Sequence, residues 1–588
     1  MRVPHLFSVM AVALGIALLA WLVDNDYYLR ILFMMGVYYL CAAGMNVLVG
    51  YAGQKSLGQA GLFAAGAYAA ALLTTSFDLD PWAALAAAAV VAGLCGVLIA
   101  WPSLRVRGPY LAMVTLAFGI VVEKLVSEWT EVFGGAEGIF GIKPLALAGT
   151  PFSNLHWVWF AIVLGAATHL LLRNLLCGRF GRAFLSLQAD EIAAESVGVS
   201  VYRYKILAFV IAAVTCGIAG AMVAQQNQYV NSDFITFHLS IFILLLVLFG
   251  GSGNLYGPLI GAVLLTLIEA LLAQWPSVQH FAYGALLLFA LYLMPNGVAG
   301  FLKQLFGAVA RQRETLPEPK ALKPAAVVAS IDASHPLLAV DDVSKYFGGV
   351  RPAQDVSFRL TPGHVHALIG PNGAGKSTMI NMITGVLTPT SGRIAFIGQD
   401  ISGTESHVIC RLGIGRTFQN LRLFANLSVL ENVLLGQHCR MKNGFWASLF
   451  ALPSSRREEA EAHRRASAIL RTVDLADLAH SPAGSLPYGL QRRVELARAL
   501  ATEPKLLLLD EPAAGLNPQE TAELGQLIVK ISRLGITILM VEHHMDWVMS
   551  ISDHIVVLDY GIKIAEGPPA AIQSDKRVIE AYLGAEAA

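Results

Sequence analysis

Roughly the first 300 residues of this chain consist mostly of apolar stretches. Each stretch is about long enough to cross a lipid bilayer as a helix. A helix needs about 20 apolar residues to cross the hydrocarbon core, where only a helix or a closed barrel satisfies every backbone polar group. About ten such stretches occur, at 6–24, 30–49, 57–75, 82–101, 109–127, 156–176, 205–225, 238–253, 256–272 and 280–300. The pattern predicts a polytopic α-helical membrane domain, in which the short eighth stretch also fits a re-entrant segment.

Composition divides the chain into more than one domain. Its 588 residues exceed what one hydrophobic core normally organises. Charged residues make up only 14% of the chain, against about 25% in soluble domains. Prolines interrupt the segment 303–336, which is typical of a linker. We therefore predict a transmembrane domain at 1–302, a linker at 303–336 and a soluble domain at 337–588. The net charge of the chain is zero, which gives no basis for a nucleic-acid partner.

Basic residues predict which loops face the cytoplasm. With the N-terminus inside, the inner loops collect most of the Lys and Arg, whereas Asp78, Asp80 and Glu131 fall in outer loops. This agrees with the positive-inside rule. An even number of spans then leaves the soluble domain in the cytoplasm. We expect residues 1–23 to be a retained first span rather than a cleaved signal peptide, because no clear small-residue cleavage site follows them.

The soluble half alternates short strand-like runs with helical patterns, which predicts an α/β fold built on a mainly parallel sheet. The runs lie at 364–370, 506–510 and 536–543. Near the C-terminus, Asp559, Tyr560 and Gly561 separate two further apolar runs. This spacing indicates a β-hairpin.

A glycine-rich loop follows the first of these strands. The run GPNGAGKS at 370–377 matches the G-x-x-x-x-G-K-[ST] pattern of a loop that wraps phosphates with backbone N–H groups. Lys376 would then reach the β- and γ-phosphates of a nucleotide, and the Ser377 hydroxyl would ligate Mg²⁺. The predicted ATP-binding loop comprises Gly370, Pro371, Asn372, Gly373, Ala374, Gly375, Lys376, Ser377 and Thr378.

Two acids and a histidine follow the other predicted core strands. The buried run LLLLD ends at Asp510 and is followed by Glu511, and the next strand is followed by His543. Asp510 is placed to hold Mg²⁺ through water, Glu511 to act as the general base and His543 to contact the γ-phosphate. We interpret the neighbouring His544 as a solvated residue at a helix start.

These residues, in this order, resemble an ABC transporter ATPase from about Leu337 to the C-terminus. The resemblance implies ATP and Mg²⁺ as cofactors. It implies that Phe347 stacks on adenine, although a core-strand role for Phe347 stays open. Gln419 in RTFQN matches the glutamine that senses Mg²⁺ and γ-phosphate, and AAGLN at 513–517 matches the D-loop.

The signature segment departs from the LSGGQ pattern of that family. This chain has Leu486, Pro487, Tyr488, Gly489, Leu490 and Gln491. Pro487 removes a serine hydroxyl and Leu490 removes a glutamine, while Gly489 and the following helix start can still offer N–H groups to phosphate. Because such sites form between two ATPase domains, we expect two non-equivalent ATP sites, with the weakened one over the partner's phosphate-binding loop.

Three Gly-punctuated segments of the membrane half, at 50–73, 105–119 and 133–139, resemble the permease of the branched-chain amino acid importer family, of the LivM type. The ATPase half resembles the LivG type. The chain therefore resembles a natural fusion of two proteins that are usually separate. For 50–73, helix breaks that line a path and simple small-residue packing are equally compatible with the sequence.

A charged, amphipathic stretch at 178–200 lies between two predicted spans. Its run EIAAESVG resembles the coupling helix that docks on the ATPase of importers, and an ordinary solvated loop helix is the alternative. The residues that carry this resemblance are Glu191, Ala193, Ala194, Glu195 and Gly198.

The resemblance implies ATP-driven import of branched-chain or related amino acids across a bacterial cytoplasmic (inner) membrane. Expected partners are a second permease subunit, a second ABC ATPase, an extracytoplasmic solute-binding protein and the lipid bilayer. An importer of amides or urea, an ABC exporter half and an ATP-gated channel or sensor remain as alternatives.

Overall fold

The computed structural model describes residues 3–23, 25–103, 106, 108–294, 296–306 and 336–583. The chain forms two compact units. The helical unit comprises Met1–Ala189, Val201–Gln312 and Phe445–Leu452, and the α/β unit comprises Asp190–Ser200, Arg313–Gly444 and Pro453–Ala588. Each unit therefore takes in a short segment from the sequence of the other. Most of the predicted linker lies outside the described residues.

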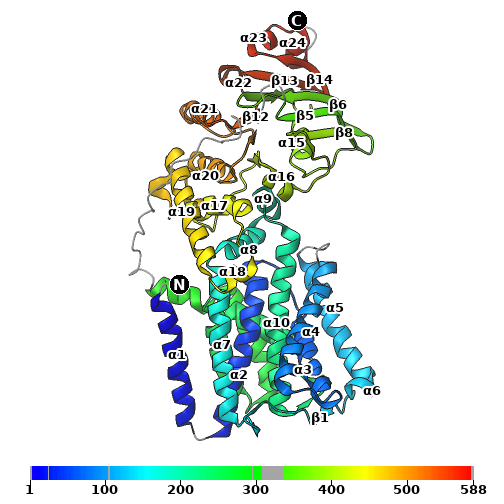
Figure 1. The fold of residues 1–588 in the computed structure, drawn as a ribbon, viewed down its shortest axis with the longest axis vertical. Coiled ribbons are helices and arrows are strands. Elements are labelled where there is room, and N and C mark those ends of the chain that lie inside the picture. The colour runs from blue at the N-terminus through cyan, green and yellow to red at the C-terminus, as the bar shows by residue number, and fades with distance from the viewer. Residues whose placement is uncertain are drawn as a thin grey trace. The chain divides into compact units, whose positions relative to one another are not determined.

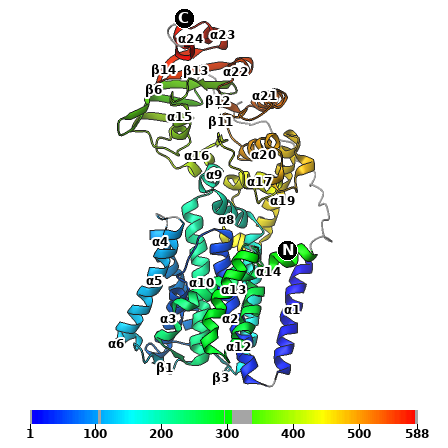
Figure 2. The same cartoon turned by 180° about the vertical axis from the view of Figure 1, so that it is seen from behind.

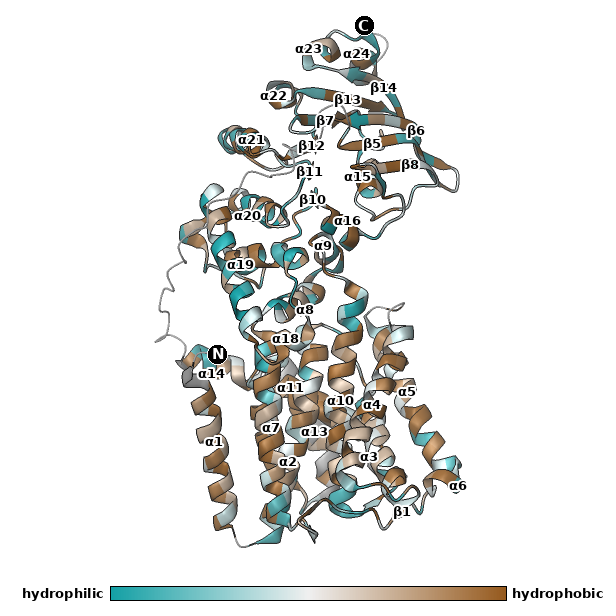
Figure 3. Cartoon of the chain, in the orientation of Figure 1, coloured by the Kyte–Doolittle hydropathy of each residue, from teal (hydrophilic) through white to brown (hydrophobic). Residues whose placement is uncertain are grey.

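The helical unit contains a helix at every stretch that was predicted to span the membrane. The helices are α1 (Val3–Leu22), α2 (Asp26–Met45), α3 (Gln59–Thr75), α4 (Pro81–Ser103), α5 (Pro109–Glu128), α7 (Asn154–Leu176), α10 (Val201–Asn227), α11 (Phe237–Gly250), α12 (Gly257–Leu272) and α13 (Pro276–Leu293). Helices α2, α3, α4, α7 and α10 run alongside one another (Figure 1), and the view from behind shows α12 and α13 (Figure 2). Apolar residues dominate these helices (Figure 3).

Helix length separates the strongest membrane spans from the others. Among the described residues, five helices are long and apolar enough to cross a membrane, and these are α2 with its continuation to Tyr51, α4, α5, α7 and α10. Helices α11 and α12 have 14 and 16 residues, which is less than the roughly 20 that a straight span needs. The predicted total of about ten spans therefore stays a prediction.

Smaller elements complete the helical unit. Helices α4, α5 and α13 begin at a proline, whose missing N–H would be unpaired at that position in any case. The remaining elements are the π-helix η1 (Asn46–Tyr51), α6 (Thr130–Phe133), β1 (Ile139–Phe140), β2 (Ala146–Leu147), β3 (Thr150–Pro151), α8 (Arg179–Ala189), β4 (Tyr229–Val230), η2 (Ser232–Phe234), α14 (Gly297–Phe306) and α18 (Phe445–Leu449).

The segment 50–73 contains a helix break and a closely packed helix, and whether the break lines a path stays a prediction. The chain leaves the π-helix at Tyr51 and resumes as α3 at Gln59. Beside this break, the Asn46 side chain accepts a hydrogen bond from Gly253 N at 2.9 Å and donates one to Asn254 O at 2.9 Å. Further along, α3 packs closely on α10, because a Cβ at Gly66 would lie 2.0 Å from the Gly217 carbonyl oxygen.

The α/β unit contains two sheets. The larger has the order β10-β11-β12-β7-β13-β14, in which β14 pairs antiparallel with β13 and the other strands are parallel. The smaller, of order β6-β5-β8-β9, is antiparallel. The strands are β5 (Leu338–Phe347), β6 (Val350–Leu360), β7 (Val365–Ile369), β8 (Ser391–Phe396), β9 (Gln399–Asp400), β10 (Ile414–Arg416), β11 (Leu506–Asp510), β12 (Thr537–Val541), β13 (His554–Asp559) and β14 (Ile562–Gly567).

Both faces of the larger sheet are covered, and this explains its continuous apolar strands. In β11, Leu507 and Leu509 pack into one core, whereas Leu506 and Leu508 pack into the core on the other face. The covering helices are α15 (Lys376–Ile383), α16 (Ser406–Leu412), α17 (Val429–Gly436), α19 (Pro453–Thr472), α20 (Tyr488–Leu500), α21 (Pro518–Arg533), α22 (Met545–Ile551), α23 (Pro569–Gln573) and α24 (Lys576–Leu583), with short 3₁₀ turns at Gln437–Arg440, Ala476–Leu478 and Ala483–Ser485.

The predicted strands and hairpin are confirmed. Strands β7, β11 and β12 lie within the three runs read from the sequence. The hairpin joins β13 to β14 through Tyr560 and Gly561, whose φ angles are +44° and +81°, as a tight two-residue turn requires. A side chain at position 561 would also approach Pro352 O at 3.0 Å.

We expect Gly66→Ala to lower the thermal stability of the detergent-solubilised chain, because the new methyl group would force α3 away from α10. Overpacking of this kind costs about 1–3 kcal/mol. The measurement is the midpoint of thermal aggregation, followed by size-exclusion chromatography. Gly119→Ala in α5 is the control, since a Cβ there meets nothing within 4 Å. Equal midpoints for the two variants would contradict the close contact.

Candidate functional site

The candidate site lies where four neighbouring parallel strands end. Strands β10, β11, β12 and β7 are adjacent in the sheet and run in the same direction, so their carboxyl ends meet at one edge. Gln419 follows β10, Glu511 follows β11, His543 follows β12 and the loop 370–378 follows β7. The sheet order therefore gathers motifs that are far apart in the sequence.

Glycines allow the phosphate-binding loop, residues 370–378, to turn tightly between β7 and α15. Gly370, Gly373 and Gly375 have φ angles of +151°, +82° and +97°. A Cβ at Gly370 would lie 2.0 Å from Leu558 O, and one at Gly375 would lie 1.9 Å from Pro352 O. A Cβ at Gly373 would meet nothing within 4 Å, so this residue faces open space where the loop can approach a ligand.

The Lys376 ammonium lies against the loop itself. Its Nζ donates hydrogen bonds of 2.8 Å to Gly370 O and of 2.8 Å to Pro371 O. Burial lowers the pKa of Lys376, and the negative charges of Glu511 and Asp510 oppose this effect. The loop thus holds a cation at the start of α15, where the helix dipole also favours an anionic ligand.

Glu511 is held from both sides. Its Oε2 accepts a hydrogen bond from Gln419 Nε2 at 3.0 Å, and its Oε1 lies 2.9 Å from His543 Nε2. The backbone at Glu511 has φ +47°, and its N–H donates to Val541 O at 2.9 Å. A non-glycine residue in this conformation costs about 1–3 kcal/mol. The surrounding structure therefore keeps the carboxylate in a fixed position between the amide and the imidazole.

Asp510 has one oxygen engaged and one oxygen free of hydrogen bonds. Its Oδ2 pairs with an Arg416 guanidinium nitrogen at 3.2 Å, whereas its buried Oδ1 has no hydrogen-bond partner. Burial raises the pKa of Asp510, and the charge of Arg416 opposes this rise. A carboxylate oxygen, the Ser377 hydroxyl and the Gln419 amide oxygen are the hard ligands that Mg²⁺ prefers. The donor set therefore fits Mg²⁺.

The sequence reading missed Glu542, which links the D-loop to His543. This glutamate is 2% exposed. It accepts hydrogen bonds from Ala513 N at 2.8 Å and from His543 N at 3.0 Å. The signal was a buried acidic residue directly after a buried strand, where a charge needs specific partners. Its neighbour His544 is the N-cap residue of α22, as predicted.

The signature segment begins helix α20 and packs on the D-loop side of the unit. Pro487 and Tyr488 are exposed, and α20 begins at Tyr488. A Cβ at Gly489 would lie 2.5 Å from a Glu520 carboxylate oxygen, and one at Gly515 would lie 3.0 Å from the Tyr488 ring. A side chain at position 489 would therefore displace the Glu520 carboxylate.

Phe347 lies apart from this edge, at the end of β5. Its side chain is 48% exposed, which contradicts the alternative role as a core-strand residue. The ammonium of Lys345 lies 5.0 Å from the ring centre, so the ring is presented on the surface beside a cation.

The predicted coupling helix forms α9 (Glu191–Ser196) and packs within the α/β unit. Ala193 and Ala194 are fully buried, so this face of α9 packs against the unit, and the role of α9 as a coupling helix stays a prediction. Gly198 has φ +85°, and a Cβ there would lie 2.5 Å from Cys439 Cβ. Glu191 and Glu195 are half-buried on the same helix.

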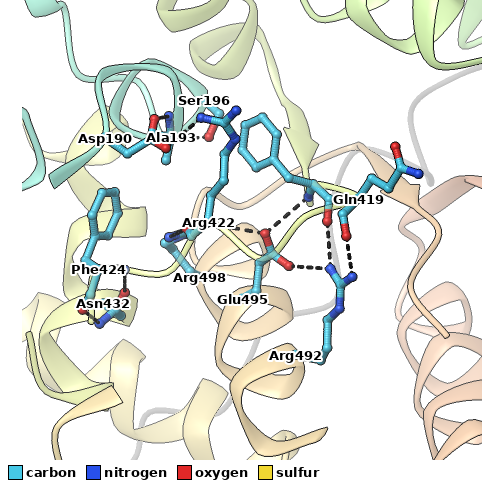
Figure 4. A network of polar contacts seen from close by, with 11 residues as sticks. Asp190, Ala193, Ser196, Gln419, Arg422, Phe424, Asn432, Arg492, Glu495 and Arg498 are labelled. Carbon is cyan, nitrogen blue, oxygen red and sulfur yellow. Dashed lines mark hydrogen bonds and ion pairs between the residues drawn. The ribbon is translucent and has the colours of Figure 1, made fainter. Parts of the chain in front are cut away.

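A buried cluster of charges on α20 holds the backbone that carries Gln419 (Figure 4). Arg492 donates to Phe418 O at 2.6 Å, and Glu495 accepts from Phe418 N at 3.2 Å. Arg498 donates to Arg422 O at 2.6 Å. Glu495 also pairs with both arginines, at 3.0 and 3.7 Å. The signature helix and the segment 418–422 therefore form one rigid structure.

A phosphate-binding loop, paired acids and a histidine at one edge of a parallel sheet define the ATPase of an ABC transporter. Comparisons with known proteins agree. Residues 353–514 match the family model described as ABC transporter, and 563–588 match that of the branched-chain amino acid ATP-binding cassette transporter. Residues 27–291 match the model described as the permease component of the branched-chain amino acid transport system.

Individual relatives match the α/β half. The chain is 46% identical over 252 residues to the high-affinity branched-chain amino acid transport ATP-binding protein BraF of Pseudomonas aeruginosa, covering 43% of this chain and 99% of the relative. It is 45% identical to LivG of Escherichia coli, with the same coverage. A solved nucleotide-free ATP-binding cassette is 36% identical, with a TM-score of 0.38, and covers 42% of this chain and 100% of that structure.

The chain belongs to the family of branched-chain amino acid ABC transporters, and it joins a permease component and an ATP-binding component in one polypeptide. It is therefore a membrane protein whose α/β unit binds and hydrolyses ATP. The predicted fold class, the predicted family and the predicted ATP-hydrolysing activity are confirmed.

We expect Glu511→Gln to lower ATP hydrolysis at least about 100-fold, because the amide cannot accept a proton from the attacking water. ATP binding should change little, since the substitution keeps the side chain's size. Hydrolysis is measured by phosphate release and binding by a fluorescent ATP analogue. Glu566→Gln, which removes an exposed carboxylate paired with Lys563, is the control. Unchanged turnover in Glu511→Gln would exclude the role of general base.

Proposed function

We propose that this chain is the fused permease–ATPase subunit of an importer that uses ATP to move branched-chain amino acids into the cytoplasm. One observation carries the proposal. Glu511 lies between Gln419 and His543 at the sheet edge that bears the phosphate-binding loop, in a chain whose other half matches a permease component. An ATP-hydrolysing site is thus covalently tied to a membrane path.

The residues of the α/β unit divide the work of binding ATP. The backbone N–H groups of residues 370–378, all except Pro371, surround the phosphates. Lys376 turns from the loop carbonyls to the β- and γ-phosphates. Exposed Phe347 stacks on adenine, a contact worth about 1–3 kcal/mol for a nucleic-acid base on an aromatic ring. Support comes from the open space at Gly373 and the exposure of the Phe347 ring.

Ser377, Gln419 and Asp510 would hold Mg²⁺, which supplies neutralisation of the phosphate charge during transfer. The unpaired Oδ1 of Asp510 supports this assignment. Glu511 takes the proton of the attacking water, and His543 contacts the γ-phosphate. Because Glu542 binds the N–H groups of both Ala513 and His543, the D-loop and His543 move together.

The family implies partner subunits. The signature segment indicates how a second ATPase would share its nucleotide sites with this chain. Residues 486–491 face the ATP bound by a second ATPase, so this chain supplies one half of each of two sites. Pro487 and Leu490 weaken its signature half. We propose a second permease, a second ATPase and an extracytoplasmic solute-binding protein as partners, in the bacterial inner membrane with the α/β unit in the cytoplasm.

We expect proteoliposomes containing the fused chain and its co-purified partners to take up leucine, isoleucine or valine when ATP and the binding protein are present. Radiolabelled solute measures uptake, and urea and acetamide are the competing substrates. Glu511→Gln should abolish uptake. Flux that continues in Glu511→Gln would favour an ATP-gated channel, and ATP-driven efflux would favour an exporter.

We expect Pro487→Ser to increase nucleotide labelling of the partner ATPase while labelling of the fused chain stays unchanged. The serine hydroxyl adds a hydrogen-bond donor at the start of α20, which points to the partner's nucleotide. Azido-ATP photolabelling separates the two polypeptides by size. Pro568→Ser, at the N-cap of α23, is the control. Loss of labelling on the fused chain would contradict the assignment of the two sites.

A further inference from the structure

A series of alternating charged and aromatic contacts connects Asp510 with the coupling helix. Asp510 pairs with Arg416 at 3.2 Å. The Arg416 guanidinium lies over the ring of Phe418, 4.7 Å from its centre, and the Arg422 guanidinium lies over the same ring at 5.3 Å. Arg422 then pairs with Asp190 at 2.6 Å. Every step is a direct contact within the α/β unit.

Arg416 is tied to the phosphate-binding side as well. It donates hydrogen bonds to Asn381 Oδ1 at 2.7 Å and to Thr384 Oγ1 at 3.0 Å, and both acceptors follow the helical turn that begins at Lys376. The guanidinium is almost completely buried. Its position therefore depends on the metal-site carboxylate and on the helix that begins at the phosphates.

Asp190 is the last residue in this series of contacts and pairs with Arg422 (Figure 4). One carboxylate oxygen accepts Arg422, and the other caps α9 by accepting from Ala193 N at 3.0 Å. Asp190 directly follows α8 and lies ten positions before Ser200, after which α10 begins. A displacement of Arg422 is therefore applied at the first residue of the segment that joins two helices of the permease half.

We propose that Arg416, Phe418 and Arg422 are positioning residues that report the charge at Asp510 to Asp190, and so set the position of the coupling helix. The proposal rests on the proposed function. A cation at Oδ1 of Asp510 competes with Arg416 for that carboxylate. Arg416 and Arg422 lie over the same Phe418 ring, and α20 holds the backbone of residues 418 and 422. A shift of the Arg416 side chain is therefore passed through the Phe418 ring to the Arg422 side chain, which pairs with Asp190.

The first test is a double-substitution cycle on the Arg422–Asp190 pair in the full chain with its partners. Asp190→Asn keeps the helix cap, since Asn caps as well as Asp, but removes the charge. Arg422→Gln removes the partner. Each single variant should lower uptake per ATP hydrolysed about tenfold, and the double variant should be no worse than either, because interacting residues are not additive. Additive losses would overturn the pairing.

The matched control is an exposed ion pair on the smaller sheet. Asp341 and Arg359 lie 3.9 Å apart and outside the series. Asp341→Asn and Arg359→Gln should leave uptake per ATP unchanged. A loss as large as that of Asp190→Asn would show that any removed charge disturbs transport, and would also overturn the proposal.

The second test needs no transport and no knowledge of the solute. Amide hydrogen exchange of residues 190–200 is compared with and without Mg²⁺ and ATP, in the Glu511→Gln background that holds nucleotide. We expect the nucleotide to change exchange in this segment, and Phe418→Leu to remove most of that change while nucleotide affinity stays within about threefold. Phe418→Leu keeps an apolar side chain in the buried position, and Arg416→Met is the second variant.

The outcomes separate the two proposals. If both Phe418→Leu and Arg416→Met leave the hydrogen-exchange response unchanged, the proposed role of Arg416, Phe418 and Arg422 is overturned, even if the protein imports amino acids. The exchange response could instead depend on Phe418 in a chain that transports none of the branched-chain amino acids. That result would support the role of the three positioning residues and refute the proposed function.

Discussion

The parallel pairing of β11 between β10 and β12 is the constraint on which the ATP site depends. Arg416 pairs in register with Leu508, and Asp510 with Val541. This register places Arg416 beside Asp510 and lets the Glu511 N–H reach Val541 O. Since a slip by one residue would turn Asp510 to the opposite face, this register fixes the position of the Asp510 carboxylate.

Buried charges organise the α/β unit around segment 418–422. Arg492, Glu495 and Arg498 each contact backbone atoms of that segment. Removing one partner from such a network leaves an unpaired buried charge, which costs about 3–5 kcal/mol. The network therefore gives one arrangement in which Gln419 and helix α20 lie at fixed positions relative to each other.

The fold could be predicted well from sequence because its signals are local. Apolar stretches of bilayer length marked the helices of the permease half, and LLLLD marked β11. Asp190, Arg422 and Glu542 were not among the residues that the sequence pointed to as site residues. Each depends on a partner that no local pattern identifies: Asp190 and Arg422 are 232 positions apart, and Glu542 holds a backbone N–H that lies 29 positions away. Phe347 is exposed and Ala193 is buried, and neither exposure could be read from the local sequence pattern.

The sequence by itself determined which chemical groups the protein carries and the local backbone that presents each one. Glycine spacing shaped the phosphate-binding loop, and strand length placed Asp510 and Glu511 at the end of a buried strand. Only the tertiary structure decided which of these groups meet. Strand order brought Glu511 between Gln419 and His543, and packing placed Asp190 against Arg422. The reason is physical: periodicity and turn chemistry act over a few residues, whereas ion pairs and sheet order join segments whose separation along the chain carries no local signal.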